Sequence, residues 1–459
     1  MALGVSATHL DWTMVPYVRF SFMKHFIINY LKTIDSFATL DLLRMSNEEL
    51  DDWISQNKSI YLKEQSLTKD DFVFEGKIKD TYTQLYNQAL FDTVLETKQA
   101  IEGFMHNANS LQSRSGNQLP FTSINYGTCT LPEGRMVNRL LLEMLIEGTG
   151  KHHRTSVFPC GIFQVKKGIN RRPGDPNYDL FRLALKATAL RLYPNYCNCD
   201  WSVQQNCVKL DRETKARVLS ELSDSAFDTL SRNLEAHPDQ LPLLGLEFKD
   251  GKLQIHQEET PLEMNGTMGC RTWNGFDVNF ENDYRKNIVK VIDGELLPDY
   301  VQTSGIQKDG RGNICPVTII LPTVAMEADR DVEKFMHLLD VRIHEAMAML
   351  IERFDHMSDQ SAASATFMYD NHTMVGYEPD KGVVSALKHG TLVIGKLGLA
   401  EALQLLVGCD HTEPKGMDLA KRIQQLYKDR CNEFKKMYRA NVGVYETPGF
   451  CGGCYSNVA

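Results

Sequence analysis

Apolar residues recur at helical spacing in several long stretches of this chain. In residues 133–147, for example, Met136, Leu140, Leu141 and Met144 fall on one stripe, as on a helix with one buried side. The same spacing predicts helices over residues 17–34, 72–104, 133–147, 179–192, 331–356 and 399–407.

Polar segments interrupt the N-terminal helices. Ser46 and Glu49 have the spacing of a capping box, which predicts a short helix through Trp53. Residues 107–118 are polar, and we expect them to form a loop.

Short apolar runs between the helices are typical of buried strands. They lie at residues 121–125, 157–165, 316–321 and 391–394, and Pro159 is expected to kink the second run because it cannot donate a ladder hydrogen bond. Strands that are apolar on both faces and alternate with helices favour an α/β fold with a covered sheet. Periodicity alone leaves a closed barrel and an open sheet equally possible.

Residues 211–258 are more polar than their surroundings. Within them, Asp250-Gly251 is a turn signal between residues 248–249 and 252–253, which predicts a surface β-hairpin. We interpret the whole segment as an excursion from the main fold and not as a domain.

Composition and charge narrow the classes of protein. The chain has 459 residues, 42% of them hydrophobic, and a net charge of −9, which argues against a general nucleic-acid binder. No apolar stretch of about 18 residues and no targeting segment are evident, so we expect no membrane span. Eleven scattered cysteines are an odd count, which favours reduced thiols and a cytoplasmic location.

The run Gly266–Thr272 contains the strongest candidate for chemistry, Cys270. Gly266 and Gly269 bracket it, and glycines allow a tight turn that presents a side chain to a pocket. Arg271 beside it would favour a thiolate or an anionic ligand. The spacing by itself favours a turn that holds an inert thiol.

Two further runs have the residue types of a substrate site. Residues 123–128 carry hydroxyls and an amide before the helix at 133, where free N–H groups suit a phosphate or a ribose, although ordinary turn and capping chemistry would look the same. Gly310-Arg311-Gly312-Asn313 precedes a strand and could let the backbone approach a substrate. It lacks the other features of a dinucleotide fingerprint, so a Rossmann site is not expected.

Metal and phosphate motifs are weak. Cys451 and Cys454 form the single Cys-x-x-Cys pair, and a zinc ribbon would need a second pair at suitable spacing. We therefore predict no metal site in this chain. The basic tetrad at residues 151–154 could meet phosphates but is more typical of a solvated turn.

Taken in order, several runs resemble the anaerobic (class III) ribonucleoside-triphosphate reductases. The resemblance extends roughly from Gly4 to Pro448, and as an ordered set it is specific although no single run is. The runs are Phe121–Thr128 with Pro132–Arg135, Val157–Pro159 with Ile162–Lys166, Asp175–Leu180, Met268–Thr272, Gly310–Asn313, His389–Thr391 with Gly395–Glu401, and Asn441–Pro448.

The resemblance implies a fold and a set of catalytic residues. The fold would be part of a ten-stranded α/β barrel of the glycyl-radical enzyme and ribonucleotide reductase type. Cys270 would be the thiyl residue that abstracts the ribose 3′-hydrogen, and Asn313 would lie near the sugar and mark the branch that uses formate as reductant. Glu401 would be a further active-site carboxylate. For contacts with the substrate the resemblance implies Ser123, Asn125, Gly269 and Arg271.

The resemblance also implies cofactors and partners. A radical-SAM iron–sulfur activase would install a glycyl radical, and zinc would bind in a C-terminal region of the family. Ribonucleoside triphosphates would be substrates, nucleotides would be effectors, and the enzyme would be a homodimer in the cytoplasm, with no nucleic acid and no membrane as partner.

The chain departs from the family pattern at both ends. We expect it to lack the family's regulatory ATP cone and the barrel elements that carry a second active-site cysteine. We also expect it to lack the four-cysteine zinc site and the Arg-x-x-Gly-Tyr radical loop, since residues 449–459 diverge after Pro448. We therefore expect residues 1–448 to form a central catalytic barrel region, incomplete at its N-terminal side and inactive by itself. The alternatives are a non-catalytic nucleotide-binding or dimerising remnant, and a zinc-ribbon interaction protein that would need stoichiometric zinc.

Overall fold

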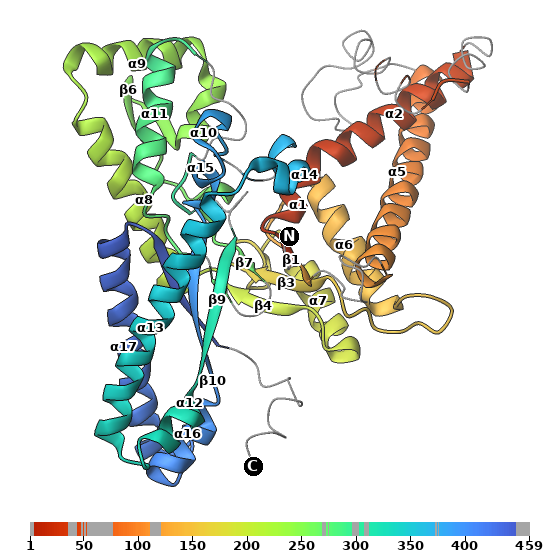
Figure 1. Ribbon diagram of the computed structural model, residues 1–459. Helices are drawn as coiled ribbons and strands as arrows, with labels where there is room; N and C mark the ends of the chain where they lie inside the picture. The colour runs from red at the N-terminus through yellow and green to blue at the C-terminus, as the bar shows by residue number, and fades with distance from the viewer. Residues whose placement is uncertain are drawn as a thin grey trace. The chain divides into compact units, whose positions relative to one another are not determined.

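A computed structural model shows how the chain folds (Figure 1). It forms two compact units, residues 2–198 and residues 199–459, and each is described by itself. The residues that the structure describes are 4–34, 44–46, 49, 52, 77–110, 121–268, 272–273, 275–295, 303–306, 312–371, 374 and 376–446.

The unit of residues 2–198 is built on a four-stranded parallel sheet in the order β1-β2-β3-β4. The register pairs Ser6 with Ser123 and Asn125 with Ile162. The strands are β1 (Gly4–Ala7), β2 (Phe121–Tyr126), β3 (Cys160–Val165) and β4 (Asn195–Asn198).

Helices cover one face of this sheet. Ile124, Tyr126 and Phe163 pack with apolar residues of α6 and α7, because alternate strand residues point to the same face. The helices of the unit are α1 (Leu10–Thr13), α2 (Val15–Ile34), α5 (Lys77–Ser110), α6 (Pro132–Glu147) and α7 (Tyr178–Arg191).

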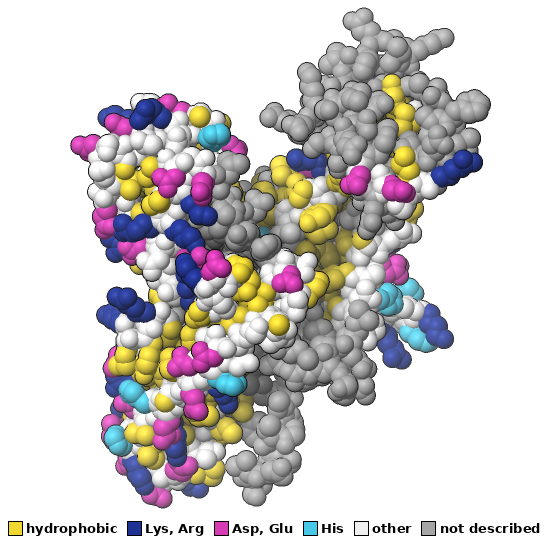
Figure 2. Space-filling view, turned by 45° about the horizontal axis from the view of Figure 1, so that its top comes forward, with side chains coloured by type: hydrophobic (Ala, Val, Ile, Leu, Met, Phe, Trp, Pro, Cys, Tyr) yellow, Lys and Arg dark blue, Asp and Glu magenta, His cyan; other side chains and the backbone are white. Residues whose placement is uncertain are grey.

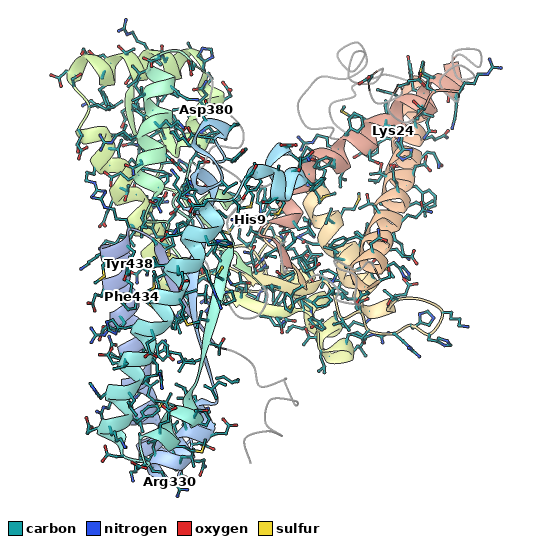
Figure 3. The ribbon with its side chains drawn as sticks, in the orientation of Figure 1. His9, Lys24, Arg330, Asp380, Phe434 and Tyr438 are labelled. Atoms are coloured by element: carbon teal, nitrogen blue, oxygen red, sulfur yellow. The ribbon has the colours of Figure 1, made fainter. Side chains whose placement is uncertain are left out.

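Helices α2 and α5 pair through a small core of their own. Phe22, Phe26, Ile27 and Leu31 of α2 pack against Ala89 of α5. Beside this core, Ser21 donates a hydrogen bond to Glu96 and the Lys24 ammonium lies 3.9 Å from the same carboxylate (Figure 3).

The unit of residues 199–459 contains a second parallel sheet, in the order β11-β10-β9. Its largest core joins β9, β10 and β11 to four helices, and Phe335, Leu339, Ile394, Ile423 and Phe434 are buried in it. The elements are β9 (Asn313–Ile320), α12 (Leu321–Glu327), α13 (Val332–Ser358), β10 (Thr391–Leu397), α16 (Leu399–Val407), α17 (Pro414–Tyr438) and β11 (Asn441–Glu446).

A helical group with a separate core precedes this sheet in the same unit. Leu230, Leu234 and Leu244 pack with Phe280 and Tyr284, all fully buried. The group consists of α8 (Ser202–Ser220), α9 (Asp224–Ala236), η2 (Pro238–Gln240), α10 (Leu241–Leu244), β5 (Leu246–Lys249), β6 (Lys252–Ile255) and α11 (Phe280–Ile292).

Short elements complete the unit. β7 and β8 form an antiparallel pair. The short elements are η3 (Pro261–Glu263), β7 (Thr267–Met268), β8 (Thr272–Trp273), η4 (Ala362–Ala365), α14 (Thr366–Asp370), η5 (Pro379–Lys381) and α15 (Val384–Leu387).

The α/β class and most of the predicted elements are confirmed. The capping box is present, since Ser46 N donates to Glu49 (2.8 Å) and Glu49 N to Ser46 (3.3 Å). The hairpin turn at Asp250-Gly251 joins β5 and β6 as expected. The predicted helix through Trp53 and residues 72–76 lie outside the described residues. A ten-stranded barrel would join strands of both units and stays a prediction.

Other predictions were wrong in their bounds or character. The loop expected over residues 107–118 is wrong for residues 107–110, which belong to α5, and residues 111–118 lie outside the described residues. β3 begins only after Pro159, and Asn109 of α5 instead accepts the N–H groups of Val157 and Phe158 (both 3.0 Å). The segment 211–258 is no polar excursion, since its helices bury their own core.

Candidate functional site

One face of the N-terminal sheet is polar, and Ser123 and Asn125 lie on it. They alternate with the core residues Ile124 and Tyr126, so their side chains point to the face opposite the helices. Both side chains are almost fully buried. Ser123 Oγ donates to Ser6 Oγ (2.8 Å), and Asn125 Nδ2 donates to the carbonyl of Ala7 (3.1 Å).

Further polar residues share this face and were missed in the sequence. Gln164 of β3 is fully buried there, and Asn195 of β4 donates to Cys160 Sγ at 3.4 Å. The available signal was the alternation of Cys160, Ile162 and Gln164 in register with Ser123 and Asn125. The run had been interpreted only as a largely apolar strand.

The loop after β2 is built around a buried carboxylate, that of Asp11. Its Oδ2 accepts the N–H groups of Gly127 (2.9 Å) and Cys129 (2.8 Å), and Asn138 Nδ2 at 3.1 Å. Gly127 has φ +117°, a conformation that glycine adopts without strain. The loop thus binds an internal anion.

Two asparagines and an arginine fix the same loop from outside. Asn177 Nδ2 donates to the carbonyls of Gly127 (3.1 Å) and Cys129 (2.8 Å), and Asn170 Nδ2 donates to that of Gly127 (2.9 Å). Arg135 holds Asn177 Oδ1 (2.6 Å) and both carboxylate oxygens of Asp179 (2.9 and 3.0 Å). Three runs of the family resemblance therefore meet at one loop.

This network changes the expectation for residues 123–128. The N–H group of Gly127, one of those that could have met a phosphate, is directed at Asp11, as is that of Cys129. Burial, and then the nearby Asp11 charge, raise the pKa of the Cys129 thiol to about 12. Ser123 and Asn125, on the polar face, remain the candidates for substrate contact in this unit.

In the other unit, β7 and β8 flank the candidate thiol. Thr267 pairs with Trp273 and Met268 with Thr272, antiparallel. Gly269, Cys270 and Arg271 lie outside the described residues, so the structure leaves their predicted roles open.

Asn313 lies at the amino end of the three-stranded sheet. It is the first residue of β9, in register with Thr391, which in turn is in register with Asn441. The N–H of Thr391 donates to the carbonyl of Gly312 (2.7 Å). A Cβ at Gly390 would lie 2.3 Å from Ile314 Cδ1, so the Ile314 side chain would have to shift to admit any other residue there.

Glu401 lies at the other end of that sheet. It is exposed in the first turn of α16, after β10 has ended at Leu397. β10 runs from the register of Asn313 to Leu397, a span of roughly 20 Å at about 3.3 Å per residue. Asn313 and Glu401 are therefore not brought together, and they cannot both contact one ribose.

A buried histidine near Asn313 was not singled out from the sequence. His389 Nδ1 lies 2.7 Å from Asp277 Oδ2, and its Nε2 lies 2.8 Å from Asp283 Oδ2. Burial alone would lower the pKa of His389, but the hydrogen bonds and charges of the two aspartates outweigh it, so the pKa lies above its ordinary value. The only signal in the sequence was its place in the run 389–391.

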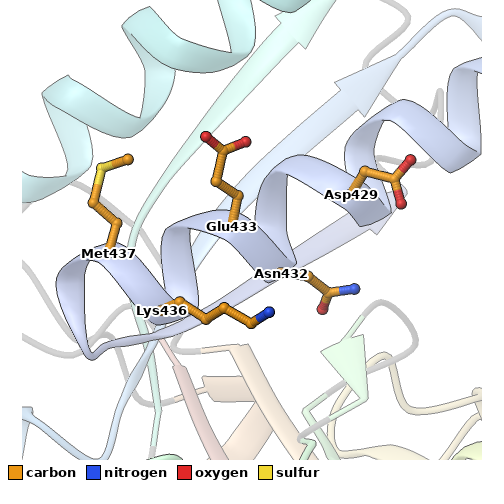
Figure 4. Close-up of a pocket in the computed structure, with 5 residues that line it drawn as sticks. All are labelled: Asp429, Asn432, Glu433, Lys436 and Met437. Carbon is orange, nitrogen blue, oxygen red and sulfur yellow. The ribbon is translucent and has the colours of Figure 1, made fainter.

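Among the described residues, the surface adds no site defined by as many contacts. The described part of the chain shows no group of three or more metal-ligating side chains and no helix long and apolar enough to cross a membrane. One open depression lies on α17, lined by Asp429, Asn432, Glu433, Lys436 and Met437 (Figure 4). Charges of both signs alternate over the helices of residues 199–459 in the view of Figure 2.

Comparison with known proteins identifies the family. The sequence model of the anaerobic ribonucleoside-triphosphate reductases matches residues 1–450, and the chain belongs to this family of reductases. The enzyme of that name from Escherichia coli K12 is 26% identical over 365 residues, which are 78% of this chain and 40% of the relative. That of phage T4 is 24% identical over 331 residues, 71% of this chain and 42% of the relative.

The chain thus spans about 40% of the length of the curated relatives that it matches. Among solved structures, it is similar to the anaerobic ribonucleotide reductase from Thermotoga maritima with glycerol in the active site. That match has 10% identity and a TM-score of 0.44, and it covers 80% of this chain and 48% of the other.

Proposed function

We propose that this chain forms the part of an anaerobic ribonucleoside-triphosphate reductase that holds the substrate and the thiyl cysteine. The observation that carries the proposal is the family match over residues 1–450, which includes Cys270 between β7 and β8. The polar, buried face with Ser123 and Asn125 supports it, since a substrate sugar needs directed donors and acceptors.

The proposed reaction is the anaerobic reduction of a ribonucleoside triphosphate to its 2′-deoxy form. The Cys270 thiyl radical takes the 3′-hydrogen atom, which leaves a thiol and a carbon radical at C3′. The 2′-hydroxyl then leaves as water after it gains a proton. Formate supplies two electrons and one proton, which together add a hydrogen at C2′, and it becomes carbon dioxide. Cys270 then returns the 3′-hydrogen to the sugar, and its thiyl radical forms again.

Abstraction of this kind needs the sulfur in near-attack contact with the C3′ hydrogen and little water nearby. In the proposal Gly269 lets the backbone approach the substrate because it has no Cβ. Arg271 meets the phosphates, for which a guanidinium is well suited. In the unit of residues 2–198, Ser123 and Asn125 are the proposed contacts for the sugar.

The proposal assigns a role to Asn313 but leaves that of Glu401 to a test. We assign Asn313 to the sugar and to the use of formate, at the amino end of β9. The carboxylate of Glu401 lies beyond the carboxyl end of β10, so its catalytic role requires a separate test. Turnover that is unchanged in Glu401→Gln would remove it from the site.

We propose the same cofactor and partners for this chain as the family resemblance implies. A glycyl radical, installed by a radical-SAM iron–sulfur activase, supplies the oxidising equivalent for Cys270. We further propose nucleotide effectors, a homodimer and a cytoplasmic location. Each of the eight described cysteines is a free thiol, in keeping with a reducing compartment.

The test combines binding and turnover under strict anaerobiosis. Binding of ATP and CTP to the chain is measured by calorimetry for the wild type, Cys270→Ser and Ser123→Ala. Turnover is measured as deoxynucleotide formation after the chain is combined with the activase, formate and the glycyl-radical region of a relative.

We expect Cys270→Ser to bind nucleotide like the wild type and to form no product. Ser123→Ala should weaken binding by about 0.5–1.5 kcal/mol, the net value of one hydrogen bond. Binding without turnover under every reconstitution would favour the non-catalytic remnant. Absence of any nucleotide binding would refute both.

A further inference from the structure

Buried charges in residues 199–459 form a connected chain of contacts that none of the proposed catalytic roles uses. At its centre is His389, 1% exposed, between Asp277, which is 0% exposed, and Asp283, which is 12% exposed. The Lys388 ammonium lies 3.1 Å from Asp283 Oδ1 on the side nearer to solvent. Two carboxylates around a histidine favour its charged form, because each ring nitrogen then faces an acceptor.

The centre is tied to the segment that follows β8. Asn441, the first residue of β11, donates from Nδ2 to Asp277 Oδ1 (2.8 Å) and accepts the N–H of Val278 (2.8 Å). Asn279 Nδ2 donates to the carbonyl of Lys388 (2.8 Å). Residues 277–279 are therefore fixed to the amino ends of β10 and β11.

The same chain of contacts continues to α8 through a single residue, Gly305. The carbonyl of Gly305 accepts the N–H of Asp277 (2.7 Å), and its own N–H donates to Asp211 Oδ1 (2.6 Å). The Asp211 carboxylate lies 2.8 Å from the Lys215 ammonium, and these two side chains are 0% and 2% exposed. Lys215 also lies over the rings of Phe280 (6.0 Å) and Tyr284 (5.9 Å).

We call these six residues, Lys215, Asp211, Gly305, Asp277, His389 and Asp283, the polar spine. It holds two segments that lead to proposed catalytic residues. Residues 277–279 begin four positions after Trp273, the last residue of β8, and residues 304–306 precede β9, which begins at Asn313. The histidine is also two residues before Thr391, the register partner of Asn313.

Buried ion pairs add little to stability relative to apolar residues of the same size, because desolvation cancels most of their attraction. They do fix geometry, since each charge accepts few arrangements of its partners. Radical abstraction tolerates little displacement between sulfur and substrate.

We propose that the polar spine is a positioning device that sets the hairpin of Cys270 relative to the amino end of β9 with Asn313, and that His389 is its central positioning residue. The catalytic role of this positioning rests on the proposed function. The mechanical coupling that it claims does not depend on nucleotide binding or turnover.

The coupling is tested by amide hydrogen exchange on the full chain, read by peptide mass spectrometry. His389→Gln is compared with the wild type and with His344→Gln, a half-exposed histidine of α13 whose ring lies 3.6 Å from Asp340. The peptides of interest cover residues 274–280 and 303–306, and the β5–β6 hairpin serves as the reference.

We expect exchange to rise at least about tenfold in both peptides of His389→Gln, a change of about 1.4 kcal/mol in local opening. The hairpin and the His344→Gln chain should exchange like the wild type. Acceleration in residues 274–280 alone, or equally in all peptides, would overturn the spine, because a local or global defect gives those patterns.

A second readout concerns Cys270 itself. Its alkylation by iodoacetamide is compared with that of Cys315 on β9, which is half-buried and provides an internal reference. The ratio of the two rates should change by at least about fivefold in His389→Gln, since a changed hairpin position alters access to one thiol only. An unchanged ratio would contradict the positioning role.

The pH profile gives a signature that a merely structural residue lacks. The groups that face His389 are Asp277 and Asp283, with Lys388 on the Asp283 side, while the Lys381 charge acts on Asp283 from η5. Above the pKa of His389 the wild-type exchange and alkylation ratio should approach those of His389→Gln, and the variant should lack this transition. A transition shared by both chains would refute the assignment to His389.

If His389→Gln does not fold, Lys388→Met provides the milder variant. It keeps the length of the side chain and the carbonyl that Asn279 uses, and it removes the charge at Asp283. We expect a smaller change of the same pattern in both peptides. No change in Lys388→Met together with an unfolded His389→Gln would count against the spine as a positioning device. Failure of nucleotide binding would refute the proposed function and leave the coupling intact.

Discussion

Replacement of Asp11 by asparagine is expected to loosen the loop after β2. The Asp11 carboxylate is 0% exposed, and its Oδ2 accepts three donors, from Gly127, Cys129 and Asn138. Its Oδ1 accepts the N–H of Trp12 at 3.1 Å. Both oxygens are therefore in use.

The magnitude follows from these contacts. Hydrogen bonds to a charged acceptor contribute about 1.5–3 kcal/mol each, and neutral ones about 1 kcal/mol. Asparagine keeps an oxygen for the three donors but turns its NH2 group toward the N–H of Trp12. We therefore expect a loss of about 3 kcal/mol, a large part of the 5–15 kcal/mol that stabilises a typical domain.

The assay uses a probe bonded to the loop, Trp12 of α1. Its Nε1 donates to Thr128 Oγ1 (3.1 Å), so the indole fluorescence reports on the loop while urea unfolds a protein whose other tryptophans, Trp53, Trp201 and Trp273, are replaced by phenylalanine. Asp92→Asn is the matched control, since that carboxylate lies on α5 and accepts Asn29 Nδ2 (3.1 Å) in part-buried surroundings.

We expect the Trp12 transition of Asp11→Asn to shift to lower urea, and that of the control to stay within about 0.5 kcal/mol of the wild type. The probe belongs to one unit, so the transitions of the two units need not coincide. If Asp11→Asn unfolds at the wild-type urea concentration, the carboxylate does not organise the loop and the reasoning fails.

Three further outcomes are expected. The pKa of His389 is raised above 6.5, so its contribution to stability is complete below pH 6.5 and is lost as the pH rises through the higher folded value. The pKa of Asp283 is lowered from 3.8, so that residue contributes above pH 3.8 and loses its contribution as the pH falls. In urea titrations above pH 6.5, the free energy of unfolding should therefore depend on pH differently in the wild type and in His389→Gln. Gly134→Ala should destabilise the protein by about 1–3 kcal/mol, because its Cβ would lie 2.2 Å from a sulfur atom, while Gly103→Ala, with open space around it, should stabilise it by about 0.5–1 kcal/mol, both read as thermal midpoints. Lys215→Met should cost about 3–5 kcal/mol by leaving a buried carboxylate unpaired, and unchanged thermal unfolding would show that the pair is dispensable.

The spacing of residues in the sequence was sufficient for the elements that depend on local patterns. The stripe of α6 and the capping box at Ser46 were predicted because they require only residues three or four apart. β4 and β11 were missed as strands, since each is short and owes its pairing to a partner strand. The helices α8 and α9 were missed because most of their residues are polar and the stripe of buried apolar residues on each is narrow.

The sequence alone was sufficient to recognise the family from its ordered runs of residues. The same runs led to Cys270 as the proposed thiyl residue. Only the tertiary structure showed that Asp11 is the anion bound by the loop after β2, that Asn313 and Glu401 lie at opposite ends of one sheet, and that His389 lies between two aspartates. The physical reason is distance along the chain. His389 and Asp277 are 112 residues apart, and no local pattern records which buried charge will face which.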